Sequence, residues 1–260
     1  MDIDRRTFSS GIFAGAALAL APATSLAAPT IPPARARNVV LIHGLYADGS
    51  SWLEVIPHLQ ARGLNVTSVQ NPLTTLPEAV AACQKVLARQ DGPTVLVVHS
   101  FGGMIITEAG TSPNVSALVY IAARAPDAGE DYAALGKRFP APPAASGIVY
   151  DGDEGRLTEQ SFLRDFVPDL PPEQGRALYA VQWPFNKALM EGKTADAAWR
   201  TKPSFYAVST EDRVVDPDLQ RFMSKRMNAT TVEIESGHVS LLSHPHEVSE
   251  LILMAAGQSG

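Results

Sequence analysis

Cysteine is nearly absent from this sequence, since Cys83 is the single cysteine among 260 residues. One thiol excludes an internal disulfide framework and a zinc cluster built on several thiolates. A chain of this length with 45% hydrophobic residues is able to bury one good-sized core, so we expect one domain with Cys83 packed in a helix.

Basic runs are also missing. The chain has 21 lysine and arginine residues against 27 aspartate and glutamate residues, and its formal net charge is −6. Such a chain offers no cluster of positive charge to neutralise phosphates. We therefore expect a small, neutral molecule as the partner and no nucleic acid.

Long hydrophobic runs are lacking too. An apolar run over residues 11–23 follows Arg5, Arg6 and Phe8 and precedes the small residues 25–27. It is shorter than the roughly 18 to 20 residues of a membrane-spanning helix. The order of charged, apolar and small segments predicts a twin-arginine export signal over residues 1–27, hence contact with an export machinery and a periplasmic or secreted protein. An uncleaved membrane anchor is the alternative.

From Asn38 onward, short β-branched runs alternate with longer amphipathic ones, which is typical of a doubly wound, mostly parallel α/β sheet. The expected strands are residues 39–43, 66–70, 94–99, 115–121, 204–209 and 230–234. The expected helices are residues 51–62, 76–89, 102–109, 218–227 and 245–254.

The alternation stops between residues 126 and 202, where an Ala, Pro and Gly-rich stretch precedes segments that look helical. We predict an inserted, mainly helical lid over one end of the sheet, with no strand long enough to join that sheet. Its apolar residues Tyr179, Trp183, Phe185 and Met190 either form a small core of their own or line a pocket.

The clearest chemical signal is Ser100, which lies between a predicted strand and a helix that begins with two glycines. A sharp strand-to-helix turn of this kind exposes a serine oxygen for nucleophilic attack. The usual pattern is Gly-x-Ser-x-Gly, and here Val98 replaces the first glycine. We expect slightly wider packing at that position.

A serine nucleophile needs a histidine base and a carboxylate that orients it. Asp212 and His238 both follow predicted strands, so they belong to the same sheet edge as Ser100, in the chain order expected for this architecture. Asp216 precedes Pro217 as a helix cap would, and Glu211 is a weaker rival. We assign Asp212 as the acid and His238 as the base.

The other histidines have less suitable positions. His99 adjoins Ser100 and has to point away from it, so we expect a packing or hydrogen-bonding role. His58 lies on a predicted amphipathic helix, and His244 and His246 flank a proline at a helix start. These three are expected to be solvated or structural.

The tetrahedral intermediate of acyl transfer needs two N–H donors for its oxyanion. Phe101, directly after the nucleophile, supplies one, and Leu45 in the loop after the first strand supplies the other. Gly44 allows the tight turn that aims Leu45, and His43 is expected to fix this loop.

Taken together, the motifs resemble the α/β-hydrolase superfamily over residues 38–256, and within it the plant methyl-ester esterase and hydroxynitrile lyase group. The segments that carry the resemblance are residues 43–44 (HG), 48–52 (DGSSW), 98–103 (VHSFGG) and 237–245 (GHVSLLSHP). The resemblance implies a lid over an apolar pocket, a Ser-Asp-His triad and no cofactor or metal.

The lyases of this group carry a threonine after the first histidine and a lysine after the catalytic one. Here the corresponding residues are Gly44 and Val239, which favour the esterases. Epoxide hydrolases and dehalogenases of this fold use an aspartate nucleophile, which Ser100 excludes.

The sequence thus predicts a serine hydrolase that cleaves small carboxylic esters through an acyl-enzyme. Three alternatives stay open: a lactonase or an acyltransferase that uses the same triad, a lyase, and a ligand-binding protein with a vestigial triad.

Overall fold

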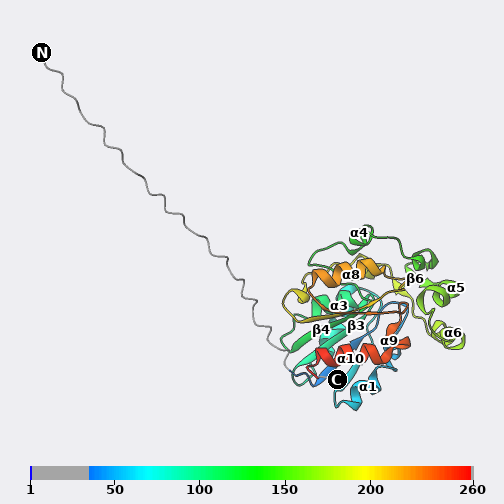
Figure 1. Ribbon diagram of the computed structural model, residues 1–260. Coiled ribbons are helices and arrows are strands. Elements are labelled where there is room, and N and C mark those ends of the chain that lie inside the picture. The colour runs from blue at the N-terminus through cyan, green and yellow to red at the C-terminus, as the bar shows by residue number, and fades with distance from the viewer. Residues whose placement is uncertain (2–34, 259–260) are drawn as a thin grey trace. The chain divides into compact units, whose positions relative to one another are not determined.

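A six-stranded parallel sheet forms the centre of the protein (Figure 1), as a computed structural model that describes Met1 and residues 35–258 shows. The strands lie in the order β2-β1-β3-β4-β8-β9, and all neighbouring strands are parallel. Their bounds are β1 (Asn38–Ile42), β2 (Asn65–Val69), β3 (Thr94–His99), β4 (Val115–Ile121), β8 (Ser204–Ser209) and β9 (Thr230–Ile234). The predicted sheet is confirmed.

The two central strands, β3 and β4, are rich in valine and other apolar residues and are buried almost throughout. Continuous apolar runs of this kind suit strands that are covered on both faces. Because the strands are parallel, the loops after β1, β3, β8 and β9 all leave the sheet at its carboxyl edge.

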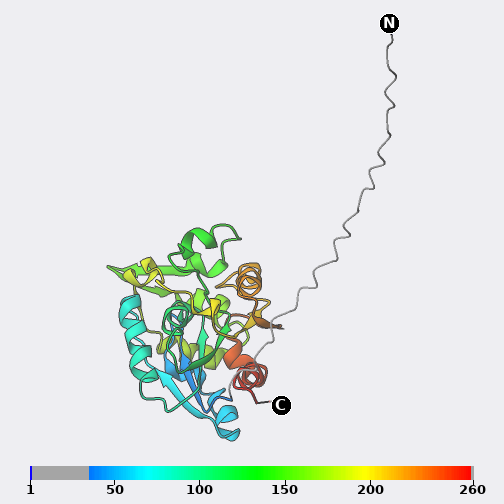
Figure 2. The ribbon, with the colours of Figure 1, turned by 90° about the vertical axis from the view of Figure 1, so that its left-hand side faces the viewer.

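Helices cover both faces of the sheet (Figures 1 and 2). On one face α2 packs against α3, with α8 beside them, and on the other α1 packs against α10. The bounds are α1 (Ile56–Ala61), α2 (Leu76–Leu87), α3 (Gly102–Ala109), α8 (Pro217–Arg226), α9 (Ser240–Ser243) and α10 (Pro245–Ala255). No helix among the described residues is long and apolar enough to cross a membrane.

The first helix differs from the prediction. A 3₁₀ turn, η1 (Gly49–Trp52), is capped by the side chain of Asp48, and α1 begins at Ile56 rather than at residue 51. Pro57 lies in the first turn of α1, where its missing N–H costs no hydrogen bond. The short helix α9, which follows His238, was not predicted.

The insertion, residues 126–202, contains short helices and a small sheet that the sequence did not predict. The sheet is antiparallel, in the order β5-β6-β7, and its strands have only four, four and two residues. The elements are α4 (Tyr132–Gly136), η2 (Pro143–Gly147), β5 (Ile148–Asp151), β6 (Glu154–Leu157), α5 (Glu159–Ser161), η3 (Phe162–Phe166), α6 (Pro172–Ala180), β7 (Phe185–Asn186), α7 (Ala188–Glu191) and η4 (Ala198–Arg200).

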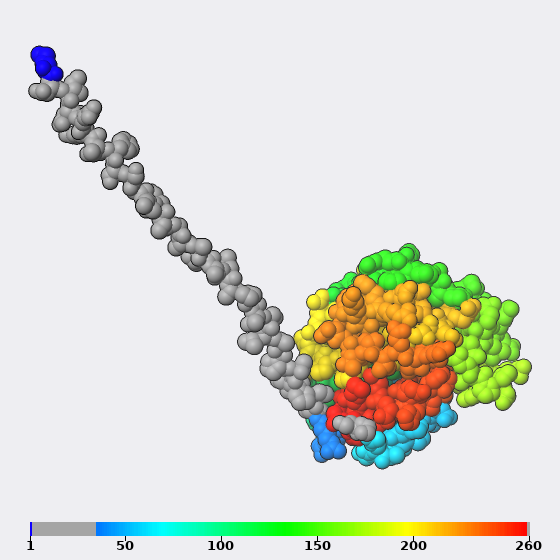
Figure 3. All heavy atoms as spheres, viewed as in Figure 1, coloured from blue at the N-terminus to red at the C-terminus, as the bar shows by residue number. Residues whose placement is uncertain are grey.

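The large apolar residues of the insertion divide between its core and its surface. Phe185 is fully buried, and its ring lies edge-on to that of Tyr46 with 5.6 Å between the ring centroids. Tyr179 packs against Phe162. Trp183 is 65% exposed. In Figure 3 the insertion, coloured green to yellow, extends along the top and right of the face shown.

The predicted export signal lies outside the described residues. Cys83 is buried in α2, as expected, and its burial raises the pKa of the thiol to about 12.

Candidate active site

Ser100 occupies the sharp turn between β3 and α3. Its φ of 55° lies in the left-handed region, which is strained for a residue with a side chain. The strain is held in place because the Ser100 N–H donates to Ile121 O at 3.1 Å and the Ser100 carbonyl accepts from Gly103 and Arg124. The turn expected at this position is therefore present.

Around this turn the backbone lies close to the loop after β1 and to the loop after β4, and glycines make this close approach possible. A Cβ on Gly103 would lie 1.7 Å from the carbonyl oxygen of Arg124, and a Cβ on Gly44 would lie 2.6 Å from Ser100 Cβ. Neither distance leaves room for a side chain. Gly44 thus brings the loop after β1 into direct contact with the serine.

Val98, which replaces the usual glycine of the motif, is completely buried. It keeps its place in β3, opposite Ile42 of β1 and Tyr120 of β4. The valine side chain is therefore part of the core.

Asp212 and His238 are in direct contact. His238 Nδ1 donates to Asp212 Oδ2 over 2.7 Å, and both side chains are buried. Gln220 Nε2 donates to the same oxygen at 2.7 Å, while the N–H groups of Val214 and Val215 donate to Oδ1. The carboxylate accepts four hydrogen bonds, which fix its orientation and so orient the imidazole.

The rival carboxylates have other surroundings. Asp216 caps α8, where its Oδ1 accepts hydrogen bonds from the N–H groups of Asp218 and Leu219. Glu211 is exposed. Neither is hydrogen-bonded to His238.

Ser100 and His238 are not joined by a hydrogen bond. His238 Nε2 is buried and has no partner among the described residues, and Ser100, 6% exposed, follows directly after His99, whose ring lies 4.5 Å from that of His238. Hydrogen bonds between nucleophile and base are often long without substrate and shorten when it binds. The free Nε2 lone pair is available to accept a proton.

His99 supports the backbone of His238. His99 Nε2 donates to the main-chain oxygen of His238 at 2.9 Å, because a carbonyl only accepts. Burial keeps the pKa of His99 well below its usual range, so the ring is neutral. The hydrogen-bonding role expected for His99 is present, but its partner was not foreseen.

The expected oxyanion donors are both free. The N–H groups of Leu45 and Phe101 donate to no acceptor within residues 35–258. His43 fixes the loop that carries Leu45, as predicted, since its Nδ1 donates to Gly44 O at 2.9 Å. Burial lowers the pKa of His43.

Two pockets flank these residues. The Ser100 pocket lies between the sheet edge and the insertion, and Met190 contributes to its wall. It is lined by Leu45, Tyr46, Ser100, Arg124, Pro142, Ala144, Ala145, Ile148, Met190, Val214 and Val215. The His99 pocket shares Tyr46 with it and is also lined by His99, Phe162, Phe166, Leu178, Val181, Val239 and Leu241, among others.

Arg124 is a charged pocket residue that sequence reasoning missed. It stands alone as a charged residue in the apolar stretch of residues 115–126, shortly after the end of the buried strand β4, and that isolation was the available signal. Gln220, which holds Asp212, gave no signal because its helix position looks like any exposed polar site.

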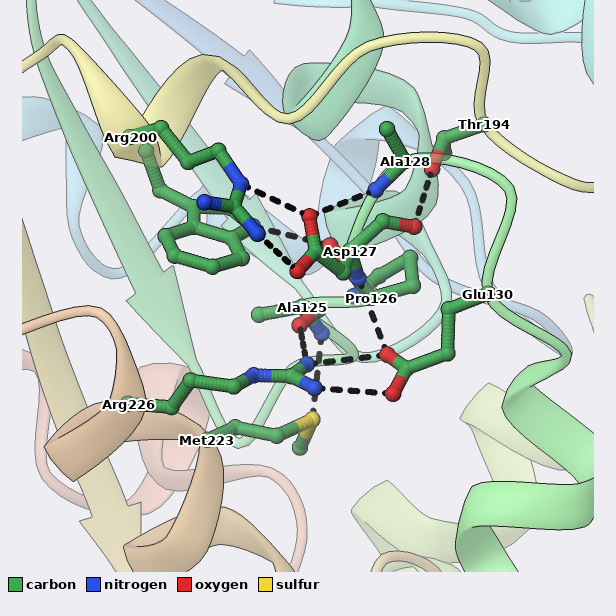
Figure 4. Close-up of polar contacts among 10 residues, drawn as sticks. Ala125, Pro126, Asp127, Ala128, Glu130, Thr194, Arg200, Met223 and Arg226 are labelled. Carbon is green, nitrogen blue, oxygen red and sulfur yellow. Dashed lines mark hydrogen bonds and ion pairs between the residues drawn. The ribbon is translucent and has the colours of Figure 1, made fainter.

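Paired charges anchor the loop that carries Arg124 (Figure 4). Arg226 binds Glu130 with both terminal nitrogens and donates to Ala125 O at 2.7 Å. Arg200 forms an ion pair with Asp127. These contacts fix the backbone on the carboxyl side of Arg124, and the bond from its N–H to Ser100 O, 3.0 Å, fixes the residue itself.

No group of three or more His, Cys, Asp or Glu side chains within residues 35–258 is arranged to hold a metal ion.

Comparisons with known proteins agree with the motifs. A pyrethroid hydrolase from Sphingobium wenxiniae is 26% identical over 245 residues, 83% of this chain and 86% of that protein. Methylesterase 2 from Arabidopsis thaliana is 24% identical over 254 residues, 85% of this chain and 97% of that protein, which confirms the predicted likeness to plant methyl-ester esterases. A crystal structure of a pyrethroid hydrolase shares the fold, with a TM-score of 0.73 at 22% identity over 83% of this chain and 95% of that chain. Residues 39–251 match the profile of the Alpha/beta hydrolase family, and the chain is a member of that family.

Proposed function

We propose that this protein is a serine hydrolase that cleaves small carboxylic esters through an acyl-enzyme. Ser100 is the nucleophile, His238 the general base and Asp212 the acid that orients it. The observation that carries the proposal is the 2.7 Å contact of Asp212 with His238 Nδ1, which leaves the buried Nε2 without a partner among the described residues.

The steps follow from the roles. His238 Nε2 takes the Ser100 proton as Oγ bonds to the ester carbonyl carbon, and the N–H groups of Leu45 and Phe101 stabilise the oxyanion. The imidazolium then gives its proton to the leaving alcohol as the ester C–O bond breaks. Water, activated by the same imidazole, hydrolyses the acyl-enzyme and restores Ser100.

Names of the relatives support ester chemistry, since they include a pyrethroid hydrolase and methylesterases. Gly44 weighs against a lyase of the related group, because those lyases carry a threonine at this position, and the backbone here leaves no room for a side chain beside Ser100. We further propose that residues 1–27 direct export, which places the activity outside the cytoplasm.

Replacement of Ser100 by alanine tests the proposal. Ser100→Ala is expected to abolish both p-nitrophenyl acetate turnover and labelling by a fluorophosphonate probe, while the circular dichroism spectrum stays unchanged. Labelling that persists in this variant contradicts the nucleophile assignment.

A substrate panel separates the remaining alternatives. Simple esters of increasing acyl length, lactones and aryl methyl esters are compared on the protein without residues 1–27, with and without an added alcohol as acyl acceptor. Multiple turnovers to the free acid support hydrolysis. A single slow turnover with retained product supports a ligand-binding protein instead.

A further inference from the structure

Arg124 places a positive charge in the Ser100 pocket without a carboxylate from residues 35–258 bound to it. The side chain is half-buried, and within that range it forms no ion pair. Its side-chain hydrogen bond is a weak one, from Nη1 to the sulfur of Met190 at 3.8 Å. Charged groups that lose water are normally paired with an opposite charge, and Arg124 has no such anionic partner in the described part of the chain.

Neighbouring arginines differ from Arg124 in this respect. Arg226 pairs with Glu130 and Arg200 pairs with Asp127, so these anions around the loop after β4 are already taken (Figure 4). Asp216 lines an adjoining cavity together with Arg124, but its Oδ1 accepts from two N–H groups of α8, and it forms no ion pair with any described residue. The lining of the Ser100 pocket thus contains no carboxylate, and the nearest candidate, Asp216, lines the adjoining cavity and caps α8.

Aromatic rings hold the guanidinium in place without neutralising it. The Arg124 guanidinium carbon lies 4.6 Å from the ring centre of Tyr132 and 5.3 Å from that of Phe101. Within residues 35–258 the side-chain hydrogen bond of Arg124 is the weak one from Nη1 to Met190, so Nε and Nη2 are left to bind a carboxylate with two hydrogen bonds. Burial lowers the pKa of Arg124, in keeping with a charge that has lost much of its water.

In the proposed function, the pocket that holds Arg124 is the one suited to the acyl part of an ester. The acyl carbon bonds to Ser100, which lines the same pocket as Arg124. The leaving oxygen has to face His238, whose neighbours His99 and Val239 line the other pocket. Apart from Arg124 and Ser100, the Ser100 pocket is lined mainly by apolar side chains, which suit a methylene chain.

We propose that Arg124 binds a carboxylate at the far end of the acyl chain, so that the preferred substrates are monoesters of short dicarboxylic acids. This inference rests on the proposed function, because it assigns the acyl group that Ser100 receives. The carboxylate supplies the anion that the pocket lacks, and the apolar walls enclose the methylenes between the two ends.

Matched pairs of esters test this inference by pH-stat titration. Monomethyl glutarate is compared with methyl pentanoate, and monomethyl adipate with methyl hexanoate, so that members of a pair differ by the terminal carboxylate. In Arg124→Gln we expect kcat/KM for the anionic esters to fall about 10- to 100-fold, the range for a hydrogen bond to a charged group. The readout is the ratio of anionic to neutral turnover within each pair, which is expected to fall by the same factor, and an unchanged circular dichroism spectrum shows that the variant is folded.

Two further variants are compared with Arg124→Gln. Arg221→Gln removes an arginine that pairs with Glu233 on the surface and lines neither pocket, so the anionic preference is expected to persist. Arg124→Lys keeps the charge but loses the bidentate fork, and we expect an intermediate loss. An equal ratio of anionic to neutral turnover in Arg124→Gln and in the unmodified protein overturns the inference.

A binding measurement distinguishes failure of this inference from failure of the proposed function. Calorimetric titration of monomethyl glutarate into Ser100→Ala is expected to show binding that is lost in Ser100→Ala/Arg124→Gln. Arg124-dependent binding without ester turnover by the unmodified protein contradicts the hydrolase alone. Turnover of neutral esters with no Arg124-dependent binding contradicts the carboxylate site alone.

Discussion

His99 donates a hydrogen bond from Nε2 to the main-chain oxygen of His238, and the two rings lie 4.5 Å apart at 51°. The residue next to the proposed nucleophile therefore holds the backbone of the proposed base. Since Nε2 carries the proton of a neutral ring, His99 Nδ1 is unprotonated, and it has no partner among the described residues. His99 is thus a positioning residue in the proposed mechanism.

The burial of His99 makes the stability of the fold sensitive to acid. Burial lowers the pKa of His99, and that of the nearby His43, below the ordinary value of about 6.5. Below that pH the unfolded chain binds protons that the folded protein does not, so stability falls as the pH drops from about 6.5 toward the folded-state pKa values. Each of the two histidines contributes a slope of up to about 1.4 kcal/mol per pH unit.

Replacing His99 by Gln tests this pH dependence, because the Gln amide keeps a donor but does not titrate. Urea unfolding between pH 7.5 and 5 is expected to show a shallower loss of free energy in His99→Gln than in the unmodified protein. His58→Gln, at an exposed position, is the control for a general effect of exchanging histidine for glutamine. An identical slope in His99→Gln and the unmodified protein contradicts the prediction.

Asp212 and Asp216 have distinct roles that matched substitutions separate. In Asp212→Asn the amide donates to His238 Nδ1, which moves the ring proton to Nε2 and removes the base, so kcat is expected to fall about 10³- to 10⁴-fold. In Asp216→Asn the new side chain caps α8 as well as the old one, so kcat is expected to stay within about threefold. Hydrolysis of p-nitrophenyl acetate measures both. A larger loss in Asp216→Asn would transfer the acid role to Asp216.

Two glycine-to-alanine substitutions test whether the close contact of Gly44 with Ser100 is required for activity. In Gly44→Ala the new Cβ would lie 2.6 Å from Ser100 Cβ, so the serine has to move and kcat/KM is expected to fall about 100-fold. At Gly136, the end of α4, an added Cβ would meet no described atom within 4 Å, and Gly136→Ala is expected to keep full activity. Equal activity in the two variants would show that contact with Ser100 is not required.

Much of the main sheet could be predicted because strands covered on both faces carry continuous apolar runs. The bounds of β3, β4, β8 and β9 agree with the sequence. The predicted start of α1 was wrong because the spacing of apolar residues takes no account of Pro57. Strands β5 to β7 were missed because runs of two to four residues show no periodicity, and their pairing depends on contacts between distant segments.

Part of the candidate site could likewise be predicted from the sequence, and part could not. Chain order and the shared carboxyl edge indicated Ser100, Asp212 and His238 as a group. By contrast, the contact of His99 with His238 spans 139 residues of sequence, and whether Arg124 has a partner depends on which anions its neighbours bind. Such facts follow from packing, which local sequence does not encode.

For Val98 the sequence motif and the structure lead to opposite expectations about a glycine at this position. Val98→Gly would restore the usual Gly-x-Ser-x-Gly pattern, yet the valine is fully buried in β3. The substitution leaves a cavity and frees the unfolded backbone, so we expect a loss of about 2–4 kcal/mol in the free energy of unfolding and no gain in activity. Val98→Ala removes most of the side chain but does not add the backbone freedom of glycine. Its loss in the free energy of unfolding, measured with urea, is expected to be smaller. A Val98→Gly protein as stable as the unmodified one would show that the valine side chain packs poorly against its neighbours.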